Sequence, residues 1–407
     1  MDKNWVLSVI ETINQWGKDG NGVSRLAFTP EDWSAKRYVM DLMQEIGMSI
    51  RTDVFGNIIG RLEGGRPGFP AVAAGSHLDT VPAGGQYDGI VGVVGALAAI
   101  RRLKEREPLS HPLELIIFAA EESSRFGFAT MGSKVMTGHA NVSSWSKAKD
   151  SGGMLLKDAL ALQGFDLAAA EQASRKAGEF KAFVELHIEQ GPVLEAEETA
   201  IGIVEAIAAP TRLKITVEGM ASHSGATPMN RRRDALVSAA MIILAVQEVA
   251  LEQAYLGTVG TVGAMKVHPG VMNVVPGLVE MWVDIRGIDH DSIIDTLQDI
   301  KDAISSIAEE QETPVAMDIL SSDKPVHMDE SIKAIIEQAC QSAGLSYKKM
   351  PSGAGHDAMN MAYITPAGMI FIPCRNGISH NTEEHTSIDQ IMAGIDVLTE
   401  TLYQLAK

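Results

Sequence analysis

Apolar positions follow two different patterns along the chain. Across Val6–Ile13 they recur every three or four residues, which predicts an amphipathic helix. A second helix is predicted to begin at Thr29-Pro30, a capping residue followed by a first-turn proline, and to end at Gly47. Leu113–Ala120 (LELIIFAA) is instead a continuous apolar run, as expected for a central strand covered on both faces. Further strands are expected at Met48–Val54, Ile58–Leu62, Ala71–Gly75, Ala182–His187 and Gly368–Pro373, and further helices at Gly89–Leu103, Asp329–Ala343 and Ile388–Leu405.

The middle of the chain has a separate order of elements, βαββαβ, which is the ferredoxin-like arrangement and is self-contained at about 110 residues. We therefore expect an α/β fold in which a larger α/β domain with a central mixed sheet is split by an inserted ferredoxin-like domain. The larger domain would comprise residues 1–210 and 324–407, and the insert residues 211–323. The insert's elements are expected at Arg212–Gly219, Arg231–Gln253, Thr258–Val267, Gly277–Arg286, Asp291–Gln311 and Thr313–Ser321.

Composition narrows the class of protein. With 407 residues, 45% hydrophobic and 21% charged, the chain is long and apolar enough for two or three folded domains and is not a disordered protein. A net charge of −18 argues against binding to nucleic acid. No stretch approaches the ~20 unbroken apolar residues of a membrane span, and the N-terminal residues do not form a signal peptide. The two cysteines, Cys340 and Cys374, form no disulfide framework, so we expect a cytoplasmic protein.

Side chains that can bind metals follow several of the predicted strands. His77 and Asp79, in Gly75-Ser-His-Leu-Asp79, come at the carboxyl end of a strand, where open α/β sheets place their ligands. A histidine can bind a metal through one ring nitrogen while a nearby carboxylate holds the other. Asp88 follows between glycines that let the backbone approach a small site closely. Taken alone, this motif is more often a hydrogen-bonded surface histidine than a metal site.

Three more strand ends carry such groups. Glu121 and Glu122 are adjacent carboxylates that point in different directions, so one can bind a metal while the other moves protons; the alternative is a solvated helix start. His187 ends an apolar strand, where a histidine is more often structural, and His380 follows the strand that ends near Pro373. Two histidines with one carboxylate would fill one metal site. A carboxylate and a histidine that share a bridging aspartate would fill a second.

The motifs together resemble those of the M20-type dinuclear metalloamidases, and the branch of N-carbamoyl-L-amino-acid hydrolase and allantoate amidohydrolase is the most similar. The resemblance rests on GSHLDTV, GGQYDG, AEESSRF, ELHIEQG, SHSGATPM, SGAGHDA and NGISHN, which occur in the family's order over nearly the whole chain. It implies two divalent metal ions per subunit, Zn, Mn or Co. In this reading the first metal is bound by His77, Asp88 and His187; Asp88 bridges; and Glu122 and His380 complete the second site. Asp79 would support His77, and Glu121 would be the general base.

The resemblance also assigns roles to the insert and to the substrate. It implies that residues 211–323 form a lid that makes a homodimer, with His223 reaching the partner's active site. Asn273 and Arg286 match the family's carboxylate-binding positions, and the planar fork of an arginine can pair with both carboxylate oxygens. A surface salt bridge is the plainer reading of Arg286. Gln190, Gly355 and His356 are further expected substrate-binding residues, for which local loop support is the alternative.

The sequence therefore predicts a metal-dependent hydrolase that cleaves the carbamoyl (ureido) C–N bond of a small carboxylate-bearing N-carbamoyl-L-amino acid or a close relative. Allantoate hydrolysis is the first alternative: GAGHDA and NGISHN favour it, whereas Ala208–Arg212 lacks the Gly-Gln-Arg run usual in that branch. Deacylation of N-acyl amino acids and dipeptide cleavage need the same metals and a different pocket. A non-catalytic metal carrier is the alternative of another class, and it would have no use for a free carboxylate such as Glu121.

Overall fold

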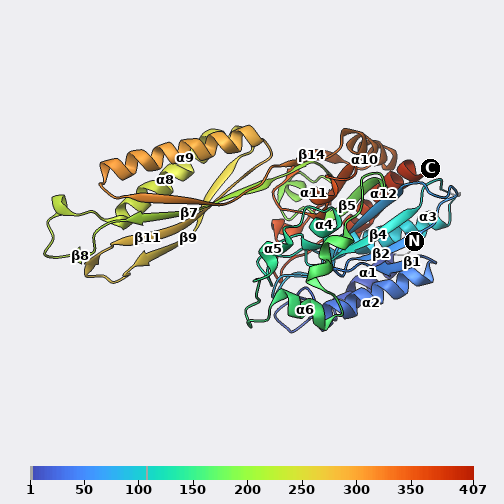
Figure 1. Ribbon diagram of the computed structural model, residues 1–407. Coiled ribbons are helices and arrows are strands. Elements are labelled where there is room, and N and C mark those ends of the chain that lie inside the picture. Colours follow the sequence, from blue (N-terminus) through green and yellow to red (C-terminus); the bar gives the residue numbers. More distant parts are fainter. Residues whose placement is uncertain (1–2, 107–108) are drawn as a thin grey trace. The chain divides into compact units, whose positions relative to one another are not determined.

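The computed structural model describes residues 3–106 and 109–407, and the chain divides into two compact units (Figure 1). The larger unit comprises Met1–Glu205 and Met328–Lys407, and the lid unit comprises Ala206–His327. The expected boundaries, at residues 210 and 324, lie a few residues inside the lid unit. The end of β6 (Ile201–Ile207) pairs with Val326–His327 just before the first lid strand, which follows after a single residue, Ala208, so these paired residues are grouped with the lid unit although they extend the larger sheet.

The larger unit is built on a mixed sheet, which confirms the expected α/β fold class. Nine strands of the described chain form it, in the order β1-β2-β4-β3-β5-β15-β6-β13, with β14 paired to β6. The pairs β4-β3, β3-β5 and β5-β15 are parallel, and the flanking pairs β1-β2, β2-β4, β15-β6 and β6-β13 are antiparallel. The remaining strands are β1 (Ser49–Thr52), β2 (Ile58–Leu62), β3 (Ala71–His77), β4 (Leu113–Phe118), β5 (Phe180–Ile188), β13 (Val326–His327), β14 (Tyr347–Ser352) and β15 (Ala367–Ile372).

Helices bury both faces of this sheet. The main core packs α1, α3, α10 and α12 against the strands, and a second apolar cluster contains residues of α4, α5 and α6. Helix α3 is rich in glycine and alanine because it is packed closely: a β-carbon on Gly92 would lie 2.4 Å from the Leu186 carbonyl oxygen. The helices are α1 (Lys3–Ile13), α2 (Pro30–Glu45), α3 (Ile90–Lys104), α4 (Met131–Met136), α5 (Val142–Trp145), α6 (Leu156–Leu162), α7 (Val193–Ala196), α10 (Glu330–Ala343), α11 (Asp357–Met361) and α12 (Ile388–Ala406), with 3₁₀ turns at Leu167–Ala173 and Arg375–Gly377.

The lid unit has the expected ferredoxin-like order. Its antiparallel sheet runs β12-β7-β11-β9, and α8 and α9 cover one face of it (Figure 1). Helix α8 begins at Ala235 rather than at Arg231, because the Asp234 side chain caps it by accepting hydrogen bonds from Leu236 and Val237. The elements are β7 (Ala209–Glu218), β8 (Ser222–His223), α8 (Ala235–Gln253), β9 (Val259–His268), β10 (Val274–Val275), β11 (Leu278–Gly287), α9 (His290–Glu310) and β12 (Val315–Ser322), with 3₁₀ turns at Met229–Arg231 and Ala254–Leu256.

Within the described residues, one helical segment, Ala235–Leu256, has the length and apolar composition of a membrane span. Gln247 and Glu248 interrupt its apolar sequence, and Ala235, Ala239 and Ile242 are buried in the core of the lid unit. Core helices of soluble domains meet the same criterion, so this segment is weak evidence for a membrane.

Candidate active site

The predicted metal-binding residues of the larger unit lie at one edge of its sheet. The four neighbouring strands β4, β3, β5 and β15 are parallel, so their carboxyl ends share that edge. His77 ends β3, His187 lies near the end of β5, and Glu121 and Glu122 follow β4. His380 lies in the loop after β15, and Asp88 in the loop between β3 and α3. The fold therefore brings together side chains that are up to about three hundred residues apart, at the edge where such sheets bind ligands.

His77, Asp88 and His187 form a first cluster, in which one possible ligand atom from each lies within 4.8 Å of the others. The Nε2 atoms of His77 and His187 lie 3.4 and 3.3 Å from Asp88 Oδ1. The Nδ1 atoms lie 2.9 Å from the main-chain carbonyl oxygens of Asp79 and Ile188, respectively. Since a carbonyl oxygen only accepts, each Nδ1 carries the proton, and each Nε2 presents its lone pair to the cluster.

Asp88, Glu122 and His380 form a second cluster on the other oxygen of the same aspartate. His380 Nε2 lies 3.1 Å from Glu122 Oε1 and 3.5 Å from Asp88 Oδ2. The hydrogen bond with Glu122 raises the pKa of His380 to about 9, although partial burial opposes the shift. Burial disfavours the charge of Asp88, but His187 and His77 outweigh it and hold the pKa of this carboxyl well below its usual value. A bridging Asp88 thus has one oxygen for each cluster.

Glu121 belongs to neither cluster, yet it lies beside them. Its Oε2 is 3.9 Å from His77 Nε2, and the residue is 8% exposed. Burial is the main cause that raises the pKa of Glu121 well above its usual range; the charges of Glu122 and Asp357 add to it and His77 opposes it. A buried carboxylate with a raised pKa next to the metal ligands is suited to accept a proton and to return it.

Asp79 supports the site in a different way from that expected. Its carboxylate is 3.9 Å from His77 Nδ1, whose hydrogen bond goes instead to the Asp79 main-chain oxygen. The carboxylate accepts hydrogen bonds from the main-chain N–H groups of Glu121 and Glu122, at 3.3 and 3.1 Å. Asp79 therefore fixes the turn that directs the two glutamates in different directions.

The donor set fits two divalent metal ions. Each cluster combines imidazole nitrogen with carboxylate oxygen, and together they offer the His77, Asp88 and His187 set and the Asp88, Glu122 and His380 set. The main-chain N–H of Gly89 donates to His187 Nε2 at 3.1 Å, so this nitrogen acts as an acceptor in the structure. Such mixed nitrogen and oxygen sites suit zinc and neighbouring divalent metals.

Gly89 is required next to the first cluster. Its φ of +67° is in the left-handed region, and a β-carbon there would lie 2.5 Å from the Cε1 and Nε2 atoms of His77. The glycines around Asp88 in the sequence therefore have the role expected of them, which is to let the backbone approach the site closely.

Glu384 and Ser379 are site residues that the sequence reasoning missed. Glu384 Oε1 accepts hydrogen bonds from the main-chain N–H groups of Tyr87 (2.7 Å) and Asp88 (3.1 Å). Ser379 Oγ lies between Glu384 Oε2 (2.8 Å) and Asp88 Oδ2 (2.7 Å). The carboxyl of Glu384 occupies space left by Gly85, where a β-carbon would be 2.2 Å from it. The sequence signal was the segment Ser379-His380-Asn-Thr-Glu-Glu384, which resembles the family's SHxPxE motif with Thr382 in place of proline, but such a motif says nothing about contacts with a loop near residue 88.

Ser379 Oγ has one hydrogen and can donate to only one of its two carboxylate neighbours at a time. Burial, followed by the charge of Asp88, raises the pKa of Glu384. The Ser379 hydroxyl is within donating distance of both Glu384 Oε2 and Asp88 Oδ2. This chain of hydrogen bonds joins the loop of Asp88 to the loop of His380.

The expected substrate residues of the larger unit lie against the first cluster. Gln190 Nε2 donates to Asp88 Oδ2 at 2.6 Å, and within the described residues its buried Oε1 has no hydrogen-bond partner. The His356 ring lies edge-on to that of His187, with centroids 4.5 Å apart, and its Nε2 is 3.0 Å from Ser352 Oγ. Burial, followed by the charge of His187, lowers the pKa of His356 well below its usual value, which favours the neutral ring. Gly355 directly precedes it in the loop before α11.

The three expected residues of the lid unit form two separate groups. His223 in β8 and Asn273 are neighbours, since the N–H of Ser224 donates to the Asn273 carbonyl oxygen at 3.0 Å. Arg286 lies near the other end of the lid sheet: it pairs with Pro210 at the start of β7, whereas Leu278 at the opposite end of β11 pairs with Glu218. At ~3.3 Å per residue along β11, the two groups are about 26 Å apart or more.

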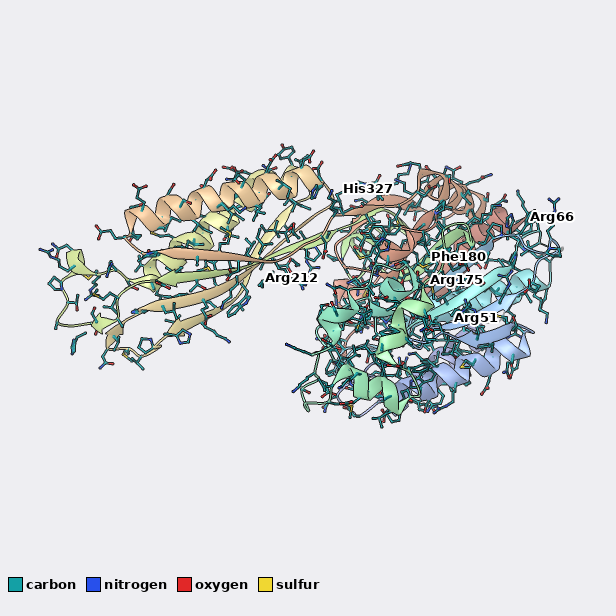
Figure 2. The ribbon with its side chains drawn as sticks, viewed as in Figure 1. Arg51, Arg66, Arg175, Phe180, Arg212 and His327 are labelled. Carbon is teal, nitrogen blue, oxygen red and sulfur yellow. The ribbon has the colours of Figure 1, made fainter. Side chains whose placement is uncertain are left out.

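Arg286 is engaged within the lid. Its Nε donates to Asp284 Oδ1 at 2.8 Å, and Arg212, labelled in Figure 2, donates to Asp284 Oδ2 at 3.1 Å. Two guanidinium groups thus share one carboxylate. Guanidinium groups suit an anionic ligand.

Comparison with known proteins decides the family. The model of Peptidase family M20/M25/M40 matches residues 73–404, which include all five predicted metal ligands. The chain belongs to this family. Three similar proteins agree with this family. They are ureidoglycolate hydrolase of Oryza sativa subsp. japonica (40% identity; 94% of this chain, 80% of the relative), N-carbamoyl-L-amino acid amidohydrolase of Geobacillus stearothermophilus (39%; 97% and 96%) and allantoate amidohydrolase of Bacillus subtilis (37%; 99% and 98%).

Solved structures agree with this assignment to the M20 family. A hydantoinase/carbamoylase family amidase from Burkholderia multivorans matches with a TM-score of 0.92 at 34% identity, covering 100% of this chain and 98% of that one. AtUAH in complex with glyoxylate matches with a TM-score of 0.83 at 36% identity, with the same coverage. The protein is thus an M20 hydrolase that acts on linear amide C–N bonds, in the branch of carbamoylases, allantoate and ureidoglycolate hydrolases.

Proposed function

We propose that the protein cleaves the carbamoyl C–N bond of a small N-carbamoyl-L-amino acid or a close relative. The observation that carries the proposal is Glu121: it is buried beside two clusters that share Asp88, and it belongs to neither. A metal carrier would have no use for such a group. Bound metal ions would polarise the ureido carbonyl and lower the pKa of a water.

In this proposal the chain's own residues move protons and hold the substrate. Glu121 takes a proton from the attacking water and passes it to the leaving nitrogen as the C–N bond breaks. The carbamic acid that remains decomposes to ammonia and carbon dioxide, so one water is consumed in total. His223 donates to the developing oxyanion. Arg286 pairs with the substrate carboxylate, and Gln190 accepts an N–H of the ureido group through its unpartnered oxygen.

Two related substrates are the alternatives. Ureidoglycolate is favoured by the 40% identity to the rice ureidoglycolate hydrolase and by the glyoxylate complex of AtUAH. Allantoate is favoured by the Bacillus subtilis relative. Both carry a ureido group and a carboxylate, so they demand the same machinery and differ from carbamoyl amino acids in the group on the α-carbon.

A substrate panel tests the proposal. On metal-reconstituted enzyme, ammonia release is measured with N-carbamoyl-L-amino acids, allantoate and ureidoglycolate. Release of free amino acid is measured with N-carbamoyl-L-amino acids, N-acetyl-L-amino acids and dipeptides. We expect the ureido compounds to be hydrolysed and Glu121→Gln to lower kcat by about 10²–10⁴ with its metal content unchanged. Activity confined to N-acetyl compounds or dipeptides would overturn the proposal, and loss of metal in Glu121→Gln would mean that Glu121 is a ligand.

We further propose that the enzyme works as a homodimer through the lid. Arg286 and the His223–Asn273 pair are too far apart within one lid to hold the same small substrate, so one of them would serve the partner's site. Helix α8 also carries an exposed apolar stripe at intervals of seven residues: Val237, Leu244 and Leu251, which are 48%, 66% and 66% exposed. Next to it, β9 is an edge strand whose backbone groups are open to pairing.

Subunit exchange tests the dimer. An inactive His223→Ala chain is mixed with an inactive Glu121→Gln chain, and the heterodimer is isolated by tags. The chain that keeps Glu121 then receives an intact His223 from its partner, so about one site in two regains activity. A heterodimer without activity would show that His223 does not act across the interface.

The metal and the compartment belong to the same proposal. We propose Zn, Mn or Co, two per subunit, because all three bind imidazole and carboxylate donors. Metal analysis after reconstitution should give two ions per chain, and His380→Ala should retain one.

A cytosolic location is supported by Cys340 and Cys374, which are buried free thiols. Fractionation of the source cells tests it.

A further inference from the structure

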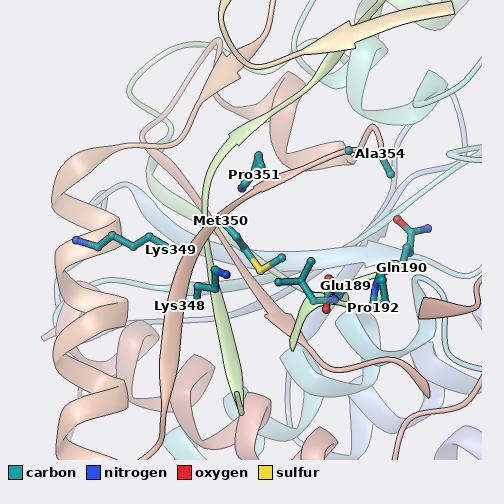
Figure 3. Close-up of a pocket in the computed structure, with 11 residues that line it drawn as sticks. Glu189, Gln190, Pro192, Lys348, Lys349, Met350, Pro351 and Ala354 are labelled. Carbon is teal, nitrogen blue, oxygen red and sulfur yellow. Dashed lines mark hydrogen bonds between the residues drawn. The ribbon is translucent and has the colours of Figure 1, made fainter. Parts of the chain in front are cut away.

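A pocket of about 530 Å³ lies in the larger unit, between the loop that follows β5 and strand β14 (Figure 3). Its volume is in the range of pockets that hold small organic ligands, ~300–1,000 Å³. Its lining includes Gln190, Pro192, Val193, Met350, Pro351 and Ala354.

Both walls of the pocket continue to the metal-binding clusters, one through Asp88, which the clusters share, and the other through His187. On one wall, Gln190 lines the pocket and also donates to Asp88 Oδ2 at 2.6 Å. On the other wall, Ala354 is followed after one residue by His356, whose ring packs against that of His187. A molecule whose ureido group is held at Asp88 and Gln190 therefore has this pocket next to it.

The surface that the pocket offers is mainly apolar. The side chains of Pro192, Val193, Met350, Pro351 and Ala354 supply it, and Met350 extends towards Pro192 in Figure 3. The charged groups at the pocket are already engaged. The ammonium groups of the two lysines pair with carboxylates, Lys348 with Glu197 and Lys349 with Glu337, and Glu189 accepts hydrogen bonds from the N–H groups of Val193 and Leu194 at 2.8 Å each.

We propose that this pocket binds an apolar side chain on the α-carbon of the substrate. The inference rests on the proposed function and names its substrate class: N-carbamoyl-L-amino acids with aliphatic side chains, rather than ureidoglycolate, which has only a hydroxyl group there. A small polar substituent leaves the apolar walls in contact with water, whereas an aliphatic chain covers them. Each methylene buried in such a pocket raises kcat/KM about fourfold.

A substrate series on the metal-loaded wild-type enzyme is the first measurement. N-carbamoyl derivatives of glycine, L-alanine, L-norvaline and L-leucine are compared by kcat/KM, together with ureidoglycolate. We expect kcat/KM to rise along the series, to about 250-fold from glycine to leucine when all four side-chain carbons are buried. Equal values for glycine and leucine derivatives, or a preference for ureidoglycolate over every carbamoyl amino acid, would overturn the pocket assignment.

A filling variant is the second measurement. Ala354→Leu places three more carbons in the pocket, and we expect it to lower kcat/KM at least tenfold for the leucine derivative and less than threefold for the glycine derivative. Retained activity on N-carbamoylglycine shows that the variant is folded. Ala161→Leu, at an exposed position of α6 outside the pocket, is the matched control. A leucine preference that survives in Ala354→Leu would also overturn the assignment.

The series separates the two proposals. If N-carbamoylglycine is hydrolysed but longer side chains bring no gain, the pocket assignment fails and the proposed function stands. If no carbamoyl compound is hydrolysed while N-acetyl compounds or dipeptides are, the proposed function itself fails.

Discussion

Replacing Glu384 by alanine is expected to weaken metal binding, although Glu384 is not a proposed ligand. The change removes the acceptor of two main-chain N–H groups, the partly buried one of Tyr87 and the buried one of Asp88, and the partner of Ser379. The loop that carries the bridging Asp88 would then lose the group that fixes it. Residues that orient metal ligands in this way typically change metal affinity by about 10–100-fold when they are replaced.

The contacts account for a loss of that size. An unsatisfied buried N–H costs about 1–3 kcal/mol, so two of them cost about 2–6 kcal/mol when no water reaches them. A loss of 10–100-fold in affinity corresponds to about 1.4–2.8 kcal/mol. The expected loss of affinity is therefore at the lower end of the range of about 2–6 kcal/mol, because the loop can relax and let water reach the N–H groups.

Glu384→Gln should behave differently, because its amide can keep the contacts of the carboxyl with Tyr87, Asp88 and Ser379. The amide oxygen can accept from Tyr87 and Asp88, and the amide nitrogen can donate to Ser379 Oγ, which remains free to donate to Asp88. We expect metal affinity within about threefold of the wild type. Glu383→Ala is the matched control: the neighbouring glutamate is exposed, and the hydrogen bonds found at this residue are made by its main chain.

The assay is equilibrium dialysis against buffered Zn²⁺ or Mn²⁺, with metal per chain measured by mass spectrometry and folding checked by circular dichroism. Wild-type affinity in Glu384→Ala would refute the argument that this carboxyl holds Asp88 in place. An equal loss in Glu384→Gln and Glu384→Ala would refute the hydrogen-bond assignment, and a loss in Glu383→Ala would point to a general effect of the loop.

Three other perturbations give clear expectations. Gly89→Ala should abolish metal binding at the first cluster, because its β-carbon would lie 2.5 Å from the His77 ring. Gly344→Ala controls for backbone strain alone, since Gly344 also has a positive φ (+66°) but no atom within 4 Å of an added β-carbon. Metal analysis of both variants checks the expectation. Cys340 and Cys374 should resist iodoacetamide at pH 8 in the native protein. Burial raises the pKa of both thiols to about 12, so the reactive thiolate forms only near and above pH 12. Mass spectrometry of labelled native protein and of labelled urea-unfolded protein checks this. Arg25→Met should destabilise the larger unit by about 3–5 kcal/mol in urea unfolding, because the buried guanidinium donates to the carbonyl oxygens of Leu78, Ile13 and Trp16.

The elements with a strong periodic pattern could be predicted from the sequence. The helix expected from Thr29-Pro30 begins at Pro30, with Thr29 accepting a hydrogen bond from Asp32, and the apolar run at Leu113–Ala120 contains β4. Strands β6 and β14 were not predicted. Their residues show no clear alternation, and their positions are set by pairing with each other and with neighbouring strands.

The sequence was enough to predict which side chains can bind metals, because these side chains have the right chemistry and follow the ends of strands. Parallel strands carry their carboxyl ends to one edge, so His77, Glu122 and His187 had to converge. The roles of Asp79 and Glu384 could not be predicted, because they are hydrogen bonds to main-chain N–H groups. Glu384 contacts Tyr87 across 297 residues of sequence, and no local pattern records such a contact.

The way the lid is inserted bears on how the larger sheet folds. Its parallel pair β5-β15 joins residues about 184 positions apart (Phe183 with Ala367), and the loop between them contains the whole lid. The entry and exit of the lid are paired neighbours, however: Thr211 pairs with Ser322, and Ile207 pairs with Val326. Once the lid has folded, it joins these two points like a tight hairpin, so the entropy lost on closing the β5-β15 loop is that of a much shorter chain. An insertion whose ends meet thus adds a domain without adding to the distance that the larger sheet must span.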